Sequence, residues 1–420
     1  MNANGKIKIE NVALVYVELP NSNAEQDMYE LQELISTANG EIKLTCSQKR
    51  SSVDPSTVVG KGKLEEIKSS LELMDAEIDV VIFSCNLNST QRATLKKVLQ
   101  LDVIDKIDLI LDIFALRATS AEGKKQVELA QLSYNLATKA DGDFSRQGAG
   151  IGTRGPGETK IETDKRVARA RITHLRAELA EIEKHRAITR KNRESNSIFT
   201  VALVGYTNAG KSTLFNRLTR SNVYADDKLF ATLDTTVRKI SLSNGINALL
   251  CDTVGFINQL PHALLNAFKS TLEEATRADL ILNVCDVSDI NVSNHIEVTE
   301  QTLAELNVSS PIVRVYNKCD KISSDAILSE TLSSDKSSLF VSALTGKNID
   351  VLLSKISDYA LLQYTTVKLK FDHKQAGKLL SLLNKYATDC SVDYCDDFVF
   401  ARATLSKKFV NIFAEYIYFG

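Results

Sequence analysis

The chain has 420 residues, of which 44% are hydrophobic and 25% are charged, and its formal net charge is −2. This length exceeds one ordinary hydrophobic core, so we expect about two to four domains in a soluble globular protein. Residues 1–10 contain charges and no apolar run, and no apolar stretch could span a bilayer, which predicts neither a secretory signal nor an integral membrane segment. The seven cysteines have no paired metal-binding spacing, which favours reduced packing residues in a cytoplasmic protein.

Residues 1–116 alternate strand and helix signals, which predicts a small α/β domain with a largely parallel sheet. Asn88, with Gln91 three residues later, predicts a helix start. The predicted strands are Val12–Val17, Glu41–Thr45, Ile78–Phe83 and the mostly apolar run Ile107–Phe114, and the predicted helices are Glu25–Ile35, Leu64–Met74 and Ala93–Leu99.

Two lysines near Gly60 and Gly62 are a weaker signal. Lys61 and Lys63, with Arg117, would be available to a second nucleotide in this domain. The run lacks the full fingerprint of a nucleotide-binding loop, so a solvated turn is the favoured interpretation.

Residues 117–195 resemble a helical hairpin. Apolar positions within Gln126–Lys139 predict its first helix, and Ile161–Asn192 predicts a longer, strongly charged second helix. Between Lys139 and Glu194 the chain carries 14 Lys and Arg residues against 9 Asp and Glu residues. A local excess of this kind is typical of one basic contact face.

The tip of this hairpin, residues 141–157, holds six of the chain's 18 glycines. Such a loop is either a flexible linker or a surface on which the backbone approaches phosphates closely, because glycine has no side chain to prevent the approach. Two arginines inside it could pair with phosphates and stack on bases, so RNA contact is the favoured interpretation. The residues expected to contact RNA are Arg146, Gly150, Gly152, Arg154 and Gly155.

The segment Gly205–Ser212 fits the phosphate-loop pattern G-x-x-x-x-G-K-[ST] at every fixed position. It follows the apolar run Ile198–Val204 and precedes a helix-like stretch, which is the strand–loop–helix setting that the motif needs. Backbone N–H groups of such a loop surround the phosphates, and the helix N-terminus adds positive potential. Lys211 would reach the β- and γ-phosphates, and the Ser212 hydroxyl would ligate Mg²⁺.

Guanine is indicated by Asn317–Asp320 (NKCD), which directly follows a second apolar strand. The N1–H and the exocyclic amine of guanine are adjacent donors, and one carboxylate can accept both. Asp320 would therefore select guanine over adenine, which lacks this donor pair. Ser342–Leu344 would add a backbone N–H to the guanine oxygen.

Two further segments have the spacing of nucleotide-dependent switches. Asp252 would hold Mg²⁺ through water, and Gly255 would offer its backbone N–H to the γ-phosphate. Thr232, within Phe230–Asp234, would close on the metal from a mobile loop. Each motif alone is common, but the ordered set predicts a domain that binds and hydrolyses GTP.

The predicted catalytic residues are Lys211, Thr232 and Gly255, and the predicted metal ligands are Ser212 and Thr232, with Asp252 acting through water. The predicted nucleotide site consists of Gly205, Tyr206, Thr207, Asn208, Ala209, Gly210, Lys211, Ser212, Thr213, Phe230, Ala231, Thr232, Leu233, Asp234, Asp252, Thr253, Val254, Gly255, Asn317, Lys318, Cys319, Asp320, Ser342, Ala343 and Leu344.

Phe256 stands where many GTPases place a glutamine that orients the attacking water. A phenyl ring forms no hydrogen bond to water, so intrinsic hydrolysis is expected to be slow until a partner completes the site. Asn208 is either a ligand of K⁺ or a side chain that stabilises the loop, and both interpretations stay open.

Residues 364–420 predict a small α/β subdomain: strand Val367–Phe371, helix Gln375–Tyr386, strand Phe398–Ala403 and an aromatic-rich end. The predicted fold is therefore α/β throughout. It comprises an N-terminal α/β domain (1–116), a helical hairpin (117–195), a P-loop GTPase domain (196–363) and the C-terminal subdomain (364–420).

Several strings resemble the signature of the HflX family of GTPases. They are QVELAQL at Gln126–Leu132, SRQ at Ser145–Gln147, GIGTRGPGE at Gly150–Glu158 and ETDKR at Glu162–Arg166, together with Phe230–Asp234 and Asp252–Phe256. The chain departs from the family pattern at Ala149, Thr235 and Lys106, none of which is a predicted phosphate or metal ligand. Thr235, where a proline is usual, frees the backbone of the first switch.

The resemblance implies a GTPase that binds the large ribosomal subunit. We further expect a cytoplasmic monomer with no DNA partner. The hairpin loop would contact rRNA in the peptidyl-transferase region, and the GTP-bound protein would split stalled or idle ribosomes under stress. The alternative is a GTP-gated assembly or silencing factor that holds the large subunit without splitting the ribosome.

Overall fold

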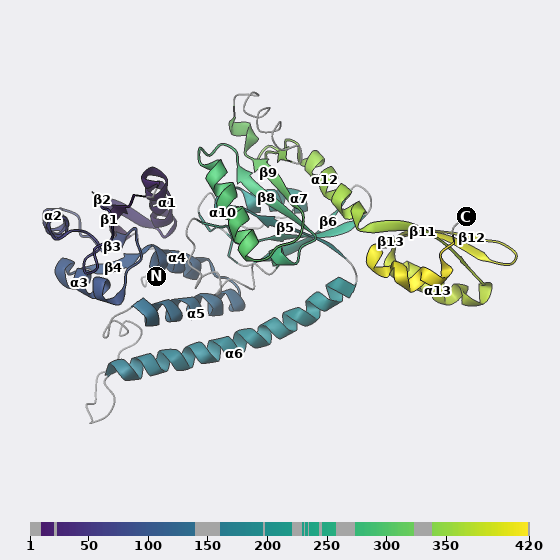
Figure 1. Cartoon of the computed structure of the whole chain (residues 1–420), viewed down its shortest axis with the longest axis horizontal. Coiled ribbons are helices and arrows are strands. Elements are labelled where there is room, and N and C mark those ends of the chain that lie inside the picture. Colours follow the sequence, from purple (N-terminus) through teal and green to yellow (C-terminus); the bar gives the residue numbers. More distant parts are fainter. Residues whose placement is uncertain are drawn as a thin grey trace, which may run out of the picture. The chain divides into compact units, whose positions relative to one another are not determined.

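The computed structural model describes residues 10–20, 23–138, 160–195, 198–220, 229–230, 232–233, 235–242, 246–257, 274–322 and 338–418. Figure 1 shows its helices and strands. Its contacts divide the chain into two compact units. The first unit comprises residues 1–183, 226–234 and 258–270, and the second comprises residues 184–225, 235–257 and 271–420.

The first unit contains a four-stranded parallel sheet in the order β2-β1-β3-β4. This arrangement confirms the predicted N-terminal α/β fold. β1 lies at the centre, and its residues Val12–Val17 are all buried. The elements are β1 (Glu10–Glu18), α1 (Ala24–Thr37), β2 (Gly40–Lys49), α2 (Lys61–Glu72), β3 (Val80–Phe83), α3 (Ser89–Leu99), β4 (Asp102–Asp105) and α4 (Lys106–Arg117).

The start of α3 confirms the predicted cap. Asn88 Oδ1 accepts a hydrogen bond of 2.8 Å from the Gln91 backbone, and Gln91 Oε1 accepts one of 3.0 Å from the Asn88 backbone. Lys61 and Lys63, by contrast, lie in the first turn of α2 and not in a turn before it. Lys63 Nζ is 2.6 Å from Glu66 Oε1, one helical turn later. A basic side chain one turn from a glutamate contributes to helix stability.

The prediction of a strand at Ile107–Phe114 is wrong, because these residues belong to helix α4. A short apolar run does not distinguish a buried strand from a buried helix, since both can be apolar on every side. The cap at the N-terminus favours the helix over a strand: Asp105 accepts hydrogen bonds from the backbone N–H groups of Ile107 and Asp108. The short strand β4, which the sequence analysis did not predict, directly precedes this cap.

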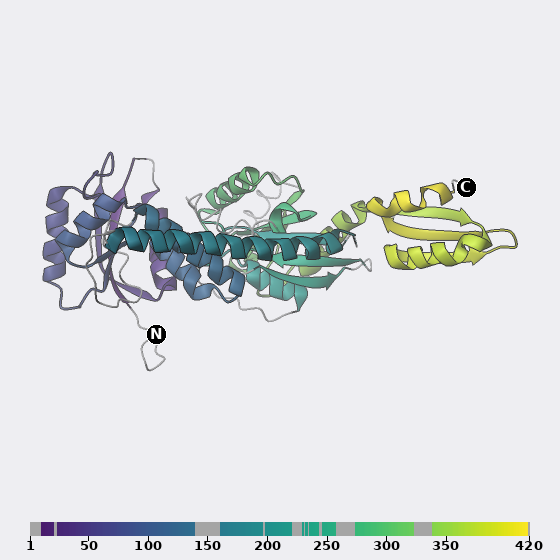
Figure 2. The same ribbon diagram turned by 90° about the horizontal axis from the view of Figure 1, so that it is seen from below.

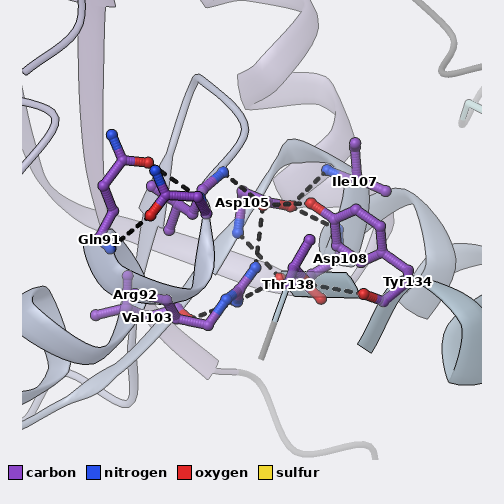
Figure 3. Close-up of polar contacts among 10 residues, drawn as sticks. Gln91, Arg92, Val103, Asp105, Ile107, Asp108, Tyr134 and Thr138 are labelled. Carbon is purple, nitrogen blue, oxygen red and sulfur yellow. Dashed lines mark hydrogen bonds and ion pairs between the residues drawn. The ribbon is translucent and has the colours of Figure 1, made fainter. Parts of the chain in front are cut away.

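Asp105 also organises a buried polar network at the carboxyl end of β4 (Figure 3). Its Oδ2 atom accepts hydrogen bonds from the Leu87 backbone at 3.0 Å, from Arg92 Nη2 at 3.0 Å and from the Tyr134 hydroxyl at 2.6 Å. Arg92 Nη1 lies 2.6 Å from Asp108 Oδ2. Burial and the neighbouring Asp105 carboxylate raise the pKa of Tyr134. The network connects α3, α4 and the first hairpin helix.

The predicted hairpin helices are observed as α5 (Ala121–Thr138) and the 36-residue α6 (Lys160–Ser195), which Figure 2 shows as one continuous helix. Glu128 of α5 accepts two hydrogen bonds from Arg171 of α6, from Nε at 2.7 Å and from Nη2 at 2.9 Å. Lys125 Nζ lies 3.2 Å from Glu178 Oε1. Within the described residues, no helix is long and apolar enough to cross a membrane.

The second unit contains a six-stranded sheet in the order β10-β9-β8-β5-β7-β6. All neighbouring strands are parallel except β6, which pairs antiparallel with β7 at the edge. The carboxyl ends of the parallel strands therefore meet at one edge of the sheet, where α/β proteins bind their ligands. The elements are β5 (Phe199–Val204), α7 (Lys211–Thr219), β6 (Thr236–Ser241), β7 (Asn247–Asp252), β8 (Leu280–Asp286), α10 (Val292–Glu305), β9 (Ile312–Asn317), η2 (Cys319–Lys321), β10 (Leu339–Phe340) and α12 (Ile349–Leu362).

The chain then forms a three-stranded antiparallel sheet in the order β11-β13-β12. Its central strand was predicted, whereas β12 was not, because half of the eight residues of β12 are polar and five of the eight are exposed. The elements are β11 (Tyr364–Phe371), α13 (His373–Tyr386), β12 (Ala387–Tyr394), β13 (Val399–Ser406) and η3 (Lys407–Tyr416).

The seven cysteines are all free thiols, and Cys46, Cys251, Cys285 and Cys319 are buried. Burial raises the pKa of Cys285 to about 12 and that of Cys85 to about 11. Thiols with such pKa values are protonated at neutral pH and are poor nucleophiles and metal ligands. Among the described residues, no three His, Cys, Asp or Glu side chains are grouped so as to hold a metal ion.

Part of the first predicted switch packs inside the first unit. Phe230 is 2% exposed, and its ring meets that of Phe114 edge-on, with centroids 4.7 Å apart. The Leu229 backbone N–H lies 3.3 Å from Thr37 Oγ1. These contacts tie residues 229–230 to α1 and α4.

Replacing Asp105 by alanine is expected to lower the free energy of opening of the first unit by about 3–5 kcal/mol, because the buried Arg92 guanidinium loses a partner and α4 loses its cap. Hydrogen exchange of α3 and β3 amides in the intact protein measures this change. Glu72→Ala, which removes a carboxylate 3.9 Å from Lys68 at an exposed position of the same domain, serves as the control. It is expected to change the free energy by less than about 1 kcal/mol. Equal effects of the two variants would contradict the central role of Asp105.

Candidate functional site

The predicted phosphate loop connects β5 to α7 at the centre of the six-stranded sheet. Gly205 and Gly210 have φ angles of +145° and +87°, which side-chain-bearing residues rarely adopt. A Cβ atom at Gly205 would collide with the Val284 backbone oxygen, and one at Gly210 would collide with Asn317 Nδ2. Glycine is therefore required at both positions for two reasons: the φ angle, and the close approach of the Val284 backbone to Gly205 and of the Asn317 side chain to Gly210.

Lys211 begins α7 and lies inside this loop. Its Nζ atom donates hydrogen bonds to the backbone oxygens of Gly205, at 3.1 Å, and Tyr206, at 2.7 Å. The residue is 7% exposed. Burial lowers the pKa of Lys211 to about 8, and the negative charge of Asp252 opposes this shift. An anionic phosphate beside Nζ would raise the pKa again, because an opposite charge favours the ammonium form.

Ser212 and Asp252 bring two oxygen donors together at the ends of the loop and of β7. The Ser212 hydroxyl donates a hydrogen bond of 2.9 Å to Asp252 Oδ2, and Asp252 is fully buried. Hydroxyl and carboxylate oxygens are the ligands that Mg²⁺ prefers, and Mg²⁺ usually retains several waters beside one or two protein ligands. These two oxygen donors fit a magnesium ion, while the assignment of Ser212 as a direct ligand and of Asp252 as a ligand through water stays a prediction.

The predicted guanine segment contacts the phosphate loop through two side chains. Asn317 Nδ2 donates a hydrogen bond of 2.9 Å to the Ala209 oxygen. Lys318 Nζ donates one of 2.9 Å to the Asn208 oxygen and lies 2.7 Å from Asp286 Oδ2. These contacts hold the chain between β9 and η2 against the loop, while the Asp320 side chain stays exposed and accessible to a base.

The second predicted guanine segment, Ser342–Leu344, follows β10. The Ala343 backbone donates a hydrogen bond of 2.9 Å to Asn317 Oδ1, so the same amide group contacts both neighbouring segments. Arg217 of α7 donates from Nε to the Ala343 oxygen at 3.0 Å and from Nη2 to the Leu344 oxygen. Ser342 and Ala343 are buried, whereas Leu344 is 71% exposed.

Gly255 and Phe256 pass beside the first half of the phosphate loop. The Phe256 backbone donates to the Gly205 oxygen at 3.0 Å and accepts from the Thr207 N–H at 2.8 Å. A Cβ atom at Gly255 would lie 2.9 Å from both Lys211 Nζ and Thr207 Cα, so a side chain does not fit there without displacement. Phe256 is 3% exposed, which places its ring in the core.

The structure thus brings together the predicted residues of four segments: the phosphate loop, Asp252–Gly255, Asn317–Asp320 and Ser342–Leu344. Thr232 and Leu233 are grouped with the first unit, so their predicted closure on the metal stays a prediction. The role of Asn208 toward K⁺ also stays a prediction. Ala231 and Asp234 lie outside the described residues, as do Arg146, Gly150, Gly152, Arg154 and Gly155 of the hairpin loop.

Two residues at this edge of the sheet were missed by the sequence analysis. Asp286 ends β8 and pairs with Lys318, and Arg217 holds the Ala343–Leu344 backbone. The signal for Asp286 was available, because it is the first carboxylate after the apolar strand Leu280–Cys285. Arg217 carried no signal, since an arginine in the last turn of a helix is a common pattern.

Comparisons with known proteins cover most of the chain. Three family models match in succession: the N-terminal model of GTP-binding GTPases at residues 25–115, their middle-region model at 117–193 and the 50S ribosome-binding GTPase model at 200–318. The chain is 42% identical to GTPase HflX of Lacrimispora saccharolytica over 410 residues, 97% of this chain and 96% of that protein. It is 40% identical to GTPase HflX of Escherichia coli over 354 residues, 83% and 82% of the two chains. A GTP-binding protein from Sulfolobus solfataricus, solved with GDP, is 28% identical with a TM-score of 0.46, over 84% of this chain and 99% of that one.

The depressed pKa of Lys211 predicts that GDP binding takes up a proton above about pH 8. The unbound side chain loses its charge as the pH rises through about 8, whereas the phosphate-bound side chain keeps it. The affinity for GDP is therefore expected to fall with rising pH, by at most about tenfold per pH unit. Calorimetry in two buffers of different ionisation enthalpy measures the uptake.

Guanosine is the matched control, because it carries the same titrating base and no phosphate. It is expected to bind without the additional proton. Identical proton uptake for GDP and guanosine would show that Lys211 does not titrate in this way.

Proposed function

Because the chain belongs to the HflX family of GTPases, we propose that it uses its GTP cycle on the large ribosomal subunit and splits stalled or idle ribosomes under stress. The chain binds guanine nucleotides and hydrolyses GTP, as its family does. The observation that supports a ribosomal target is the match of residues 200–318, which include most of the predicted nucleotide site, to the 50S ribosome-binding GTPase model.

In this proposal the protein acts as a monomer, and the hairpin loop contacts rRNA in the peptidyl-transferase region. Arg146 and Arg154 pair with phosphates or stack on bases, and Gly150, Gly152 and Gly155 allow close backbone approach. Support comes from the paired helices α5 and α6 on either side of the loop, which side-chain contacts such as Arg171–Glu128 hold together. A loop anchored by two packed helices can be positioned by them.

Different residues of the nucleotide site have different roles in GTP hydrolysis. Lys211 binds the β- and γ-phosphates and stabilises the negative charge that develops during transfer, and Asp320 selects guanine. Ser212 and Asp252 hold Mg²⁺, which neutralises phosphate charge when bound. The Gly255 N–H and Thr232 engage the γ-phosphate and the metal when the first switch is ordered.

Hydrolysis by the protein alone is slow in this proposal, because the buried Phe256 ring cannot orient the attacking water. Docking on the large subunit would order Thr232 and Gly255 and would position the attacking water. Steady GTP turnover is thus expected to rise on addition of purified large subunits, by about tenfold or more, since positioning contributes most of phosphoryl-transfer catalysis.

Phosphate release, measured with and without large subunits, tests this expectation, and small subunits provide the control. Equal turnover in all three conditions would exclude stimulation by the large subunit.

Splitting itself is measured by light scattering of intact ribosomes mixed with the protein and a non-hydrolysable GTP analogue. Scattering is expected to fall as subunits separate. A variant lacking residues 148–157 should lose this activity, because the loop no longer reaches rRNA, while it binds GTP as before. Glu72→Ala, which breaks an exposed ion pair within α2 and leaves the hairpin unchanged, should retain splitting.

Unchanged scattering with a stable complex on the large subunit would favour the alternative, a GTP-gated assembly or silencing factor. Splitting by the loop-deleted variant would remove the loop from the mechanism.

A further inference from the structure

The C-terminal sheet has one face covered by helices and one face that no function proposed so far uses. Alternate residues of β11 and β13, such as Val367, Leu369, Ala401 and Ala403, are buried in the core that includes α13 and η3. Figures 1 and 2 show both helical elements side by side on the same face of this sheet. Successive side chains of a strand point to opposite faces, so the intervening residues line the other face.

The register of β11 and β13 defines the composition of that second face, which we name the open face. Thr366 is paired with Thr404, Lys368 with Arg402 and Lys370 with Phe400. The hydroxyls of Thr366 and Thr404 lie 3.1 Å apart across the two strands, as expected for side chains on one face. Lys368 and Arg402 are exposed, and Lys370 and Phe400 are partly exposed.

Three aromatic rings gather around one cation at the end of the open face. Lys370 Nζ lies 3.9 Å from the ring centroid of Phe398, 5.8 Å from that of Phe400 and 5.9 Å from that of Tyr418. The rings of Phe400 and Tyr418 meet edge-on with centroids 5.9 Å apart. Tyr418 is 44% exposed, although aromatic side chains are usually buried in a folded domain.

Backbone contacts hold Tyr418 in this position. Its N–H donates a hydrogen bond of 2.8 Å to the Lys368 oxygen, and Ile417 forms an antiparallel bridge with Leu369. The last described residues thus continue the sheet beside β11, with the Tyr418 ring next to the Lys370 ammonium. The aromatic and basic groups are pre-positioned, which limits the entropy that binding would cost.

Charge is distributed unevenly over the open face. Lys368, Lys370 and Arg402 lie on β11 and β13, whereas the carboxylates of Asp389 and Asp393 lie on β12, paired with Thr404 and Phe400. The half of the open face that β11 and β13 form is both basic and aromatic. It is suited to a negatively charged chain that also carries flat rings. Single-stranded nucleic acid has this combination, because its phosphates repeat along the backbone and its bases can stack on aromatic side chains.

We propose that the open face of the C-terminal sheet binds single-stranded RNA. Bases stack on Phe400 and Tyr418, and phosphates pair with Lys368, Lys370 and Arg402. Double-stranded RNA does not fit, because its bases are stacked on each other and unavailable to the rings. The proposed site is independent of the hairpin loop and of the nucleotide cycle.

The test is binding of a fluorescent oligouridine of about ten nucleotides to the full-length protein, measured by anisotropy. Phe400→Ala is expected to weaken binding by about tenfold, because stacking on that ring is lost. Phe400→Trp keeps a stacking surface and should retain binding. Arg402→Glu should also weaken binding by about tenfold or more, since it replaces phosphate attraction by repulsion.

Lys374→Glu provides the matched control for charge. Lys374 is an exposed residue of α13, which lies on the covered side of the same subdomain, and the substitution changes the net charge as Arg402→Glu does. It should leave binding within about twofold, since rim charges distant from a bound phosphate are screened. Unlabelled single-stranded RNA should compete for the site, and the corresponding duplex should not.

Three results would overturn the proposal: no binding by the wild-type chain, an equal loss in the Lys374→Glu protein, or full competition by duplex RNA. A fourth is unaltered RNA binding by both the Phe400→Ala and the Arg402→Glu proteins, because the open face would then not be the RNA site. Because the assay contains neither ribosomes nor GTP, none of these results bears on ribosome splitting.

Discussion

The nucleotide site depends on one amide group, that of Asn317. Its nitrogen donates to the Ala209 oxygen of the phosphate loop, and its oxygen accepts from the Ala343 backbone, so a single buried side chain connects three loops that follow different strands. A buried hydrogen-bonding side chain of this kind is expensive to leave unsatisfied, which makes the three loops mutually dependent. The requirement for glycine at position 210 has the same origin, because any Cβ atom there would collide with this amide.

The general α/β architecture was predictable from the sequence, but two of its elements were not. Ile107–Phe114 is apolar except for Asp108 and Asp112, and such a short, mostly apolar run does not separate a strand from the helix that forms. The decisive signal was local: Asp105 and Asp108 form a capping box, although the acidic residue at its third position is an aspartate and not the usual glutamate or glutamine. β12 was not predicted for a different reason, since half of its residues are polar and none of the eight is fully buried.

Within the candidate site, the sequence placed each motif after an apolar strand, and parallel pairing then brings those strand ends to one edge. Spacing could not reveal contacts between distant motifs, such as Lys318 with Asn208 or Arg217 with Ala343. Those contacts depend on strand order, which is set by tertiary packing. The lowered pKa of Lys211 was equally invisible, because it follows from complete burial of a residue type that is usually exposed.

The burial of Phe230 in the first unit has a thermodynamic consequence for the loop that contains Thr232. Transferring a ring of this size from water to a packed interior is worth about 2–3 kcal/mol, and the Phe114 contact adds a directional term. Any rearrangement that withdraws the ring from the first unit loses that free energy. Part of the loss is regained because the Phe230 backbone, with φ at +53°, can relax from an unfavourable conformation. By linkage, substitutions at Phe114 or Thr37, which contact this loop and are not predicted nucleotide ligands, would change the free energy needed to move the loop out of the first unit.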